Sequence, residues 1–194
     1  MLVTAQDVLD FWFLPIGEKG HNRQRPEWFR KDDAFDREIF TRFGDVVEDA
    51  LVGGLRQWDD EGTQGALARI LVLDQFTRNI YRGTPKAFAG DPLALEAARA
   101  LDDAGANQTL PPVQRAFAYM PFEHAENLSL QERSVILFDK LNASASGFEG
   151  SLDYARRHYD VIRKFGRFPH RNAILGRQST PEEVEFLKQP GSGF

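Results

Sequence analysis

The chain has 194 residues, a formal net charge of −5 and no cysteine. This length suits one domain with a real core, and 42% hydrophobic with 27% charged residues is an ordinary globular composition. The absence of cysteine excludes disulfides, thiolate catalysis and iron–sulfur clusters, and the net negative charge argues against general binding to nucleic acid or to an anionic membrane.

The N-terminal residues lack the features of a targeting segment. Residues 1–7 have neither the basic start nor the apolar run of a signal peptide, and no stretch of the chain reaches the length of a membrane span. We therefore expect a cytoplasmic protein with no membrane partner. Nucleic acid is not an expected partner either.

The first predicted helix begins at Thr4, which can cap it, and ends before Pro15. Its apolar residues are so dense that the helix must pack against other elements. Residues 14–27 are predicted to form a loop that shields part of the protein, with residues 21–25 solvated. After the loop, Trp28 and Phe29 are expected to return to the interior.

The next two predicted helices differ in character. From Asp32 or Asp33 to Leu51, apolar residues recur at helical spacing with charged residues between them, which is typical of an amphipathic surface helix. The helix that begins at Thr63 is apolar nearly all round over residues 66–73, which predicts a central position.

This central helix ends in an abruptly polar segment, residues 74–82. When its apolar line is continued by helical steps, it reaches Asp74 and then Arg78. A carboxylate and a guanidinium are therefore expected one turn apart on the side that faces the core. Buried charges of this kind need partners.

The remaining helices are predicted from their end signals. Prolines at first helical positions indicate helices from Pro92 and from Pro112, capping boxes indicate helices from Ser129 and from Ser146, and the segment 180–183 indicates a last short helix. No segment shows the alternation of a strand bounded by hairpin turns. We predict an all-α fold of about eight helices with no sheet, in one domain over residues 1–188, and a flexible tail over residues 189–194.

Three polar segments follow apolar helices, at residues 74–82, 123–126 and 167–177. If antiparallel neighbours bring these helix ends together, arginines, carboxylates and two histidines converge on one cleft. Guanidinium groups bind carboxylates and phosphates through two parallel hydrogen bonds, so we expect a small anionic metabolite there. The candidate ligand-binding residues are Asp74, Gln75, Arg78, Asn79, Arg82, Glu126, Arg167, Arg171 and Asn172.

The same cleft has candidate catalytic residues. Glu123, His124 and His170 are side chains that can transfer a proton near neutral pH. The alternative is an ion-pair and capping network that fixes loops to helices, with His170 bonded to a backbone carbonyl. The sequence leaves open whether the protein is an enzyme, which oligomer it forms and which ligand it binds.

Metal and cofactor sites are not expected. Glu123 and Glu126, with His158 and His170, have suitable donor atoms, but His124 points away from the face that the two glutamates share, and no His-Glu-x-x-His pair occurs. Glycine-rich phosphate loops and the Gly-x-Ser-x-Gly motif of serine hydrolases are also missing. We predict no metal and no cofactor.

Three segments, residues 73–85, 119–126 and 165–172, carry a resemblance to a known family. In them and over most of its length the chain resembles the bacterial family called domain of unknown function 924. The resemblance implies an all-helical fold similar to tetratricopeptide-repeat superhelices, and it implies no activity. A helical scaffold that binds a peptide or protein on a concave surface is therefore the alternative to a metabolite-binding protein.

Overall fold

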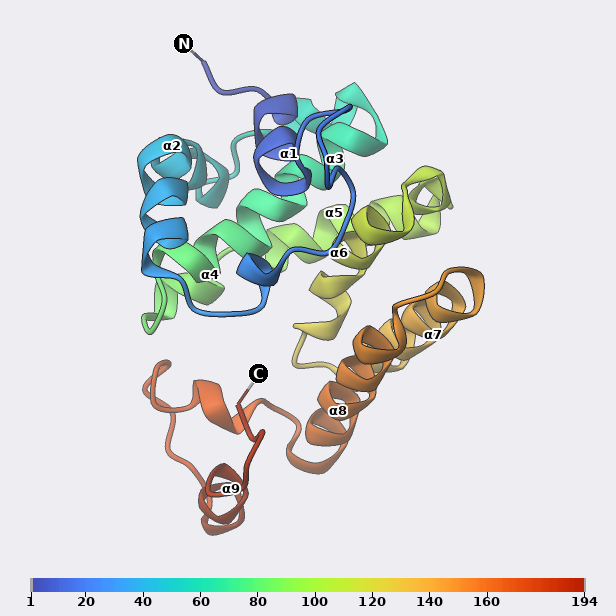
Figure 1. Ribbon diagram of the computed structural model, residues 1–194. Helices are drawn as coiled ribbons and strands as arrows, with labels where there is room; N and C mark the ends of the chain where they lie inside the picture. Colours follow the sequence, from blue (N-terminus) through green and yellow to red (C-terminus); the bar gives the residue numbers. More distant parts are fainter. Residues whose placement is uncertain (1, 194) are drawn as a thin grey trace. The chain divides into compact units, whose positions relative to one another are not determined.

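The computed structural model describes residues 2–193 of the protein, and within this range the chain forms nine α-helices and no strand (Figure 1). The prediction of an all-α fold without a sheet is confirmed, whereas the tetratricopeptide-like superhelix stays a prediction. No helix in residues 2–193 combines the length and the apolar character that crossing a membrane requires. The helices are α1 (Ala5–Phe13), α2 (Asp33–Leu51), α3 (Thr63–Ile70), α4 (Thr77–Ile80), α5 (Asp91–Asp103), α6 (Pro112–Glu123), α7 (Leu128–Ser144), α8 (Glu149–Phe165) and α9 (Pro181–Leu187).

The chain divides into two compact units. Unit 1 comprises Met1–Arg82 and Lys86–Pro121, and unit 2 comprises Gly83–Pro85 and Phe122–Phe194. Each unit has its own buried apolar residues. The single domain predicted over residues 1–188 stays a prediction.

Unit 1 has an aromatic core. Trp12 of α1 is fully buried, and its ring lies 5.7 Å from that of Trp28 and 5.6 Å from that of Phe117. Aromatic pairs at these separations add to the stabilisation that burial alone provides. The predicted return of Trp28 to the interior is confirmed, but the prediction for Phe29 is wrong. Phe29 is 65% exposed. It follows the short 3₁₀ turn Pro26–Trp28, in which Trp28 is the residue that faces the core of unit 1.

The loop over residues 14–27 is bound to the C-terminal end of α1. Arg25 donates hydrogen bonds to the carbonyl oxygens of Phe11 and Trp12 at 2.8 and 3.0 Å, and a ring nitrogen of His21 lies 2.6 Å from the carbonyl oxygen of Leu14. The expectation of solvated side chains over residues 21–25 is therefore wrong for His21 and Arg25. A helix end has carbonyls without partners inside the helix, and these side chains supply donors.

The predicted central helix is one continuous helical segment made of α3, a π-helical stretch (Leu71–Phe76) and α4. Its apolar residues from Ile70 to Leu73 are fully buried, which confirms the predicted central position. A π-helical turn contains one more residue than an α-helical turn, and such turns occur often at functional sites. The turn lies at the point where the helix changes from apolar to polar side chains.

Unit 2 is built on α7 and α8, which lie side by side as a helical hairpin (Figure 1). Asn127, not the predicted Ser129, caps α7, and its side chain accepts a hydrogen bond from the backbone N–H of Leu130. The predicted capping box of α9 is confirmed, because Thr180 and Glu183 bond reciprocally to each other's backbone N–H.

The segment that follows α9 contacts α8. Arg157 donates to the carbonyl oxygen of Gly191 at 3.1 Å, and the hydroxyl of Ser192 donates to that of Leu187 at 3.1 Å. Of the predicted tail over residues 189–194, Phe194 lies outside the described residues. The predicted flexibility of this segment stays a prediction.

Gly90, the residue before α5, gives a test of this fold. A Cβ atom added at Gly90 would collide with the backbone carbonyl oxygen of Leu73, which belongs to the π-helical stretch and cannot move as a side chain can. We expect Gly90→Ala to lower the free energy of unfolding by about 1–3 kcal/mol, measured by urea denaturation. Gly150→Ala in α8 is the matched control, because no atom lies within 4 Å of its added Cβ. Equal stability of the two variants would contradict the close contact of α5 with Leu73.

Candidate functional site

The first predicted cluster lies in unit 1, on the π-helical stretch and α4. The Asp74 side chain is fully buried, and Arg78 lies 3.3 Å from one of its carboxylate oxygens. Arg78 also forms two hydrogen bonds with the carboxylate of Asp91, at 2.7 and 3.0 Å. Burial by itself would lower the pKa of Arg78, but the charges of Asp74 and Asp91 outweigh it and raise the pKa above its ordinary value.

The other side chains of this cluster also have partners in unit 1. Asn79 donates to the carboxylate of Asp36 at 2.6 Å, and Arg82 binds the same carboxylate through two of its nitrogens. Gln75 donates to Asp74 at 2.6 Å. The alternative interpretation, an ion-pair and capping network, describes these contacts. Convergence of this cluster with the other two in one cleft stays a prediction.

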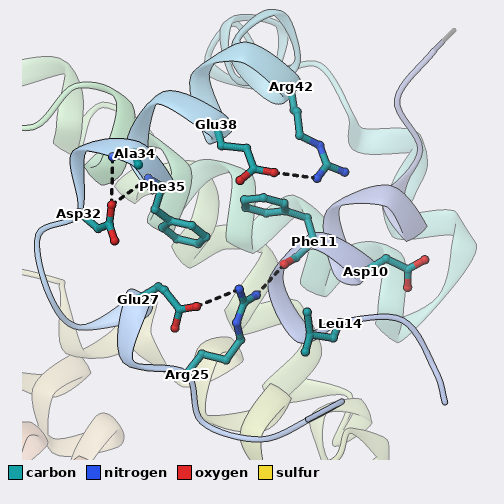
Figure 2. A pocket seen from close by; sticks show the side chains of 10 residues that line it. All are labelled: Asp10, Phe11, Leu14, Arg25, Glu27, Asp32, Ala34, Phe35, Glu38 and Arg42. Atoms are coloured by element: carbon teal, nitrogen blue, oxygen red, sulfur yellow. Dashed lines mark hydrogen bonds and ion pairs between the residues drawn. The ribbon is translucent and has the colours of Figure 1, made fainter. Parts of the chain in front are cut away.

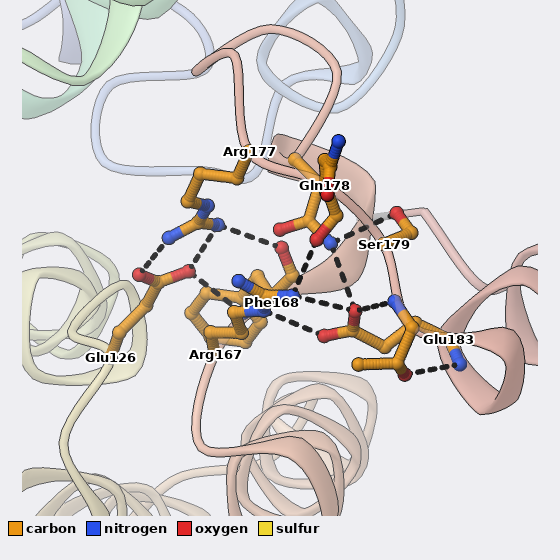
Figure 3. Close-up of polar contacts among 9 residues, drawn as sticks. Glu126, Arg167, Phe168, Arg177, Gln178, Ser179 and Glu183 are labelled. Carbon is orange, nitrogen blue, oxygen red and sulfur yellow. Dashed lines mark hydrogen bonds and ion pairs between the residues drawn. The ribbon is translucent and has the colours of Figure 1, made fainter.

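The second and third predicted clusters both belong to unit 2, and Glu126 connects them (Figure 3). Glu126 forms two hydrogen bonds with Arg177, at 2.7 and 2.9 Å, and accepts one from the backbone N–H of Phe168 at 2.7 Å. Arg177 in turn donates to the carbonyl oxygen of Phe168 at 3.2 Å. Both backbone groups of Phe168 are thus bound by one ion pair.

The pKa of Glu126 reflects these contacts. Burial alone would raise it, but the hydrogen bonds from Arg177 and from the backbone of Phe168 outweigh burial and lower the pKa below its ordinary value. Glu126 is therefore a carboxylate at neutral pH.

A second carboxylate, Glu183 of α9, binds the start of the same segment (Figure 3). Arg167 donates to both of its oxygens at 2.7 Å, Asn172 donates at 3.2 Å, and the backbone N–H of Thr180 donates at 2.8 Å. The hydrogen bond from Arg167 is the largest cause that lowers the pKa of Glu183, to about 2. Two predicted ligand-binding residues, Arg167 and Asn172, thus hold a loop to a helix.

Four polar side chains of unit 2 lie at or near Phe168, in a group that we call the Phe168 cluster. The ring of Phe168 is fully buried, and its centroid lies 5.3 Å from the ring of His158, 5.6 Å from that of His170 and 4.5 Å from the guanidinium carbon of Arg171. The His124 ring lies 6.3 Å from that of His158. The cluster consists of His124, His158, Phe168, His170 and Arg171.

His158 is the buried centre of this cluster. Its Nδ1 lies 2.9 Å from the carbonyl oxygen of Tyr154, and because a carbonyl only accepts, the proton of the neutral ring is on Nδ1. Burial is the largest cause that lowers the pKa of His158, and the positive charges of His124, Arg171 and His170 lower it further, to about 3. His158 is therefore neutral at physiological pH.

Glu123 lies at the edge of the Phe168 cluster. Its carboxylate is 3.5 Å from Nδ1 of His158, and the residue is 6% exposed. Gln131 of α7 fixes the chain after Glu123, because its amide donates to the carbonyl oxygens of Glu123 and Ala125 at 2.6 and 2.8 Å. All three predicted catalytic residues thus belong to unit 2, with His124 and His170 in the cluster and Glu123 against His158.

Four residues of this region were not predicted as site residues. From the sequence, His158 is a candidate only for a metal ligand, and Arg177 is included only as the end of the polar segment 167–177. No contact of Gln131 or Glu183 with the site is predicted. The sequence could have identified Arg177 as a site residue, because it ends the dense polar segment 167–177. No feature of the sequence identifies Gln131, because a buried glutamine that bonds backbone carbonyls cannot be told from any other helical glutamine by sequence. Among residues 2–193, no group of three or more histidine, aspartate or glutamate side chains is arranged to hold a metal ion.

Comparison with known proteins gives the family. The family described as "Bacterial protein of unknown function (DUF924)" matches residues 8–191. The chain belongs to this family. A solved protein of unknown function from Agrobacterium tumefaciens is 39% identical, with a TM-score of 0.81 over 95% of this chain and 96% of that one. No curated protein matches this DUF924 chain.

The Glu183 contacts of this DUF924 protein predict a dependence of stability on pH. A carboxylate whose pKa is lowered to about 2 contributes stability that is complete above its unfolded pKa near 4.5 and is lost as the pH falls toward 2. We expect Glu183→Gln to unfold with a free energy lower by about 2–3 kcal/mol at pH 7, and the difference to shrink below pH 4.5. Urea denaturation between pH 7 and pH 3 measures it.

Glu182→Gln is the matched control for this experiment. Glu182 is the neighbouring residue of α9, its side chain is 68% exposed, and it pairs with Lys164 at the surface. Exposed pairs contribute at most about 1 kcal/mol, so this variant should stay close to the wild type. A Glu183→Gln variant with wild-type stability at pH 7 would refute the structural role of this carboxylate.

His158 predicts a dependence in a different pH range. The unfolded chain takes up a proton at this histidine below pH 6.5, whereas the folded protein does not until about pH 3. Stability therefore falls as the pH decreases from 6.5 toward 3, by as much as about 1.4 kcal/mol per pH unit from this group. His158→Gln should lose less stability than the wild type between pH 6.5 and pH 5 in urea denaturation. Identical losses would show that the histidine is not held neutral.

Proposed function

We propose that this DUF924 protein binds a small anionic metabolite at the Phe168 cluster of unit 2. The observation that carries the proposal is the gathering of Arg171, His158 and His170 around the buried ring of Phe168, with His124 beside His158. Arg171 is only 6% exposed, and its guanidinium carbon lies 4.5 Å from the centroid of the Phe168 ring. We also propose a cytoplasmic location, with which the absence of cysteine is compatible.

The electrostatics of the cluster support an anion. Burial is the largest cause that lowers the pKa of His158, and His124, Arg171 and His170 each lower it further. Positive groups that repel each other in a site of low dielectric constant are stabilised by a bound negative charge. Arginine in addition matches the two-oxygen geometry of carboxylates and phosphates.

The contacts of the other arginines narrow the set of residues that we assign to the ligand. Arg167 is bound by Glu183 and Arg177 by Glu126, each through two hydrogen bonds. We assign positioning roles to Arg167 and Arg177. We assign ligand binding to Arg171, because its guanidinium carbon lies 4.5 Å from the centroid of the Phe168 ring, and to His124 and His170 of the same cluster.

The proposal includes acid–base chemistry by the three candidate catalytic residues, Glu123, His124 and His170. Glu123 and the two histidines can donate or accept a proton beside a bound anion, and the 3.5 Å separation of Glu123 from His158 keeps the carboxylate beside the cluster. Whether the bound metabolite is converted is a separate question from whether it is bound, and binding is the first step to measure.

Binding can be tested with inorganic phosphate and succinate as probes. We expect both anions to raise the thermal unfolding midpoint of the wild type. In the Arg171→Gln variant, the Kd of the anion that binds more tightly should rise by at least about tenfold, because a charge-assisted hydrogen bond is lost. Calorimetric titration gives the Kd directly.

Arg163→Gln is the control with the same change of net charge. Arg163 lies on the exposed side of α8, with a side chain 62% exposed that pairs with Asp160. The Arg163→Gln variant should bind phosphate and succinate with the same Kd values as the wild type. Equal affinity of the wild type and the Arg171→Gln variant, or no stabilisation by either anion, would refute the proposed site.

A second candidate function, binding of a peptide or protein partner, has support in a different surface of unit 2. A groove of about 580 Å³ runs along α7 and α8, and Ile136 on its edge is 45% exposed. Exposed apolar side chains in a groove are typical of surfaces that bind helical or extended peptides. The residues that line it are Glu132, Val135, Ile136, Arg156, Tyr159 and Asp160.

A further inference from the structure

The segment between α6 and α7, residues 124–127, supplies one side of the Phe168 cluster, and we call it the α6–α7 linker. His124 of the linker lies beside His158, and Glu126 of the linker binds the backbone of Phe168. The position of the linker therefore decides how its side chains meet those that α8 and the segment after α8 supply.

Gln131 of α7 holds the α6–α7 linker through its backbone. The residue is fully buried, and its amide nitrogen lies 2.6 Å from the carbonyl oxygen of Glu123 and 2.8 Å from that of Ala125. These two carbonyls flank His124 in the chain. Carbonyls at the end of an α-helix have no partner inside the helix, and here the two N–H groups of one side chain satisfy them.

The orientation of the Gln131 amide is fixed by its surroundings. If the amide were turned over, its oxygen would face the two carbonyl oxygens, and none of the three atoms could donate. In the orientation that the structure has, the amide oxygen is buried and has no hydrogen-bond partner among residues 2–193. A buried acceptor without a partner lowers stability, so the fold tolerates this loss at the place where the two donors bind the linker.

Unit 1 has a charged side chain in the corresponding role. Figure 2 shows Arg25 between the carbonyl oxygen of Phe11, in the last turn of α1, and the carboxylate of Glu27. The Arg25 side chain is 18% exposed, whereas Gln131 is fully buried. A buried guanidinium would need a carboxylate partner, and a neutral amide does not, so an amide suits the buried linker.

We propose that Gln131 is a positioning residue of the anion site, which sets the place of His124 in the Phe168 cluster by holding the carbonyls on both sides of this histidine. Gln131 acts through the linker and makes no contact with the ligand. This inference rests on the proposed function for its ligand, but the place of His124 can be measured without one.

Two variants of the full chain remove the donors of Gln131 in different ways. Gln131→Met keeps the length of the side chain and removes both N–H groups. Gln131→Glu keeps the shape, and the introduced carboxyl group has one O–H donor when it is protonated and none when it is ionised. Burial raises the pKa of a carboxyl group by about 3–5 units, so this group should change its charge between pH 6 and pH 8.5.

Calorimetric titration with inorganic phosphate measures the effect on the ligand. We expect Gln131→Met to raise the Kd by at least about fivefold over that of the wild type. The ratio of the Gln131→Glu Kd to the wild-type Kd should be at least about fivefold at pH 8.5 and should fall by at least about threefold at pH 6, because protonation returns a donor to the linker. A residue that only fills space in the core would give the same ratio at both pH values.

Proton NMR of the histidine rings measures the place of His124 without a ligand. The His124 ring lies 6.3 Å from that of His158, and the chemical shifts of a ring proton depend on such aromatic neighbours. The His124 resonances should therefore shift in Gln131→Met, and in Gln131→Glu they should shift at pH 8.5 and return toward the wild-type positions at pH 6. The resonances of His21, which belongs to unit 1, should not respond to either variant.

Ser134→Ala is the matched control for both measurements. Ser134 lies about one turn further along α7 and is also fully buried, and its hydroxyl has no hydrogen-bond partner in the part of the chain that the structure describes. This variant should have the phosphate Kd and the His124 resonances of the wild type. The positioning role is overturned if the His124 resonances stay unchanged in both Gln131 variants, if the Kd ratio of Gln131→Glu does not depend on pH, or if Ser134→Ala has the same effects.

Failure of the anion site itself would give a different result. In that case phosphate and succinate do not bind the wild type, whereas the His124 resonances still shift in the two Gln131 variants.

Discussion

The ion pair of Glu126 with Arg177 is the interaction on which the geometry of unit 2 depends. Its two members bind the N–H and the C=O of Phe168, at 2.7 and 3.2 Å, so they fix one residue from both sides of its backbone. The ring of that residue then touches His158, His170 and Arg171. Loss of one partner would leave the other charge partly buried and the ring unsupported, which costs more than loss of a surface ion pair.

The same constraint, that a buried charge needs a partner, organises unit 1 in another way. There Asp74 lies on the π-helical stretch, and Arg78 connects it to Asp91 of α5. Asp36 of α2 binds α4 through Asn79 and Arg82. Charged side chains thus join helices that apolar contacts alone would hold less specifically, and Arg167 and Arg177 serve a similar purpose in unit 2.

In unit 2 the carboxylates of Glu126 and Glu183 bind the guanidinium groups of Arg177 and Arg167, each through two hydrogen bonds. Burial lowers the pKa of His158, and His124, Arg171 and His170 each lower it further. The anion that we propose would add a negative charge to these surroundings.

The sequence by itself determined the all-α fold, the burial of the central helix and the position of several helix ends. These follow from apolar spacing and from capping residues such as Thr4 and Thr180, which act within a few residues of chain. It also located the dense polar segments, because such composition is local.

Only the tertiary structure decided which charged side chains pair with each other. Arg167 and Arg171 lie four residues apart and are equally basic in the sequence, yet one binds Glu183 of α9 and the other lies on the ring of Phe168. Pairing of charges depends on distances between elements far apart in the chain, and hydrophobic periodicity carries no information about those distances.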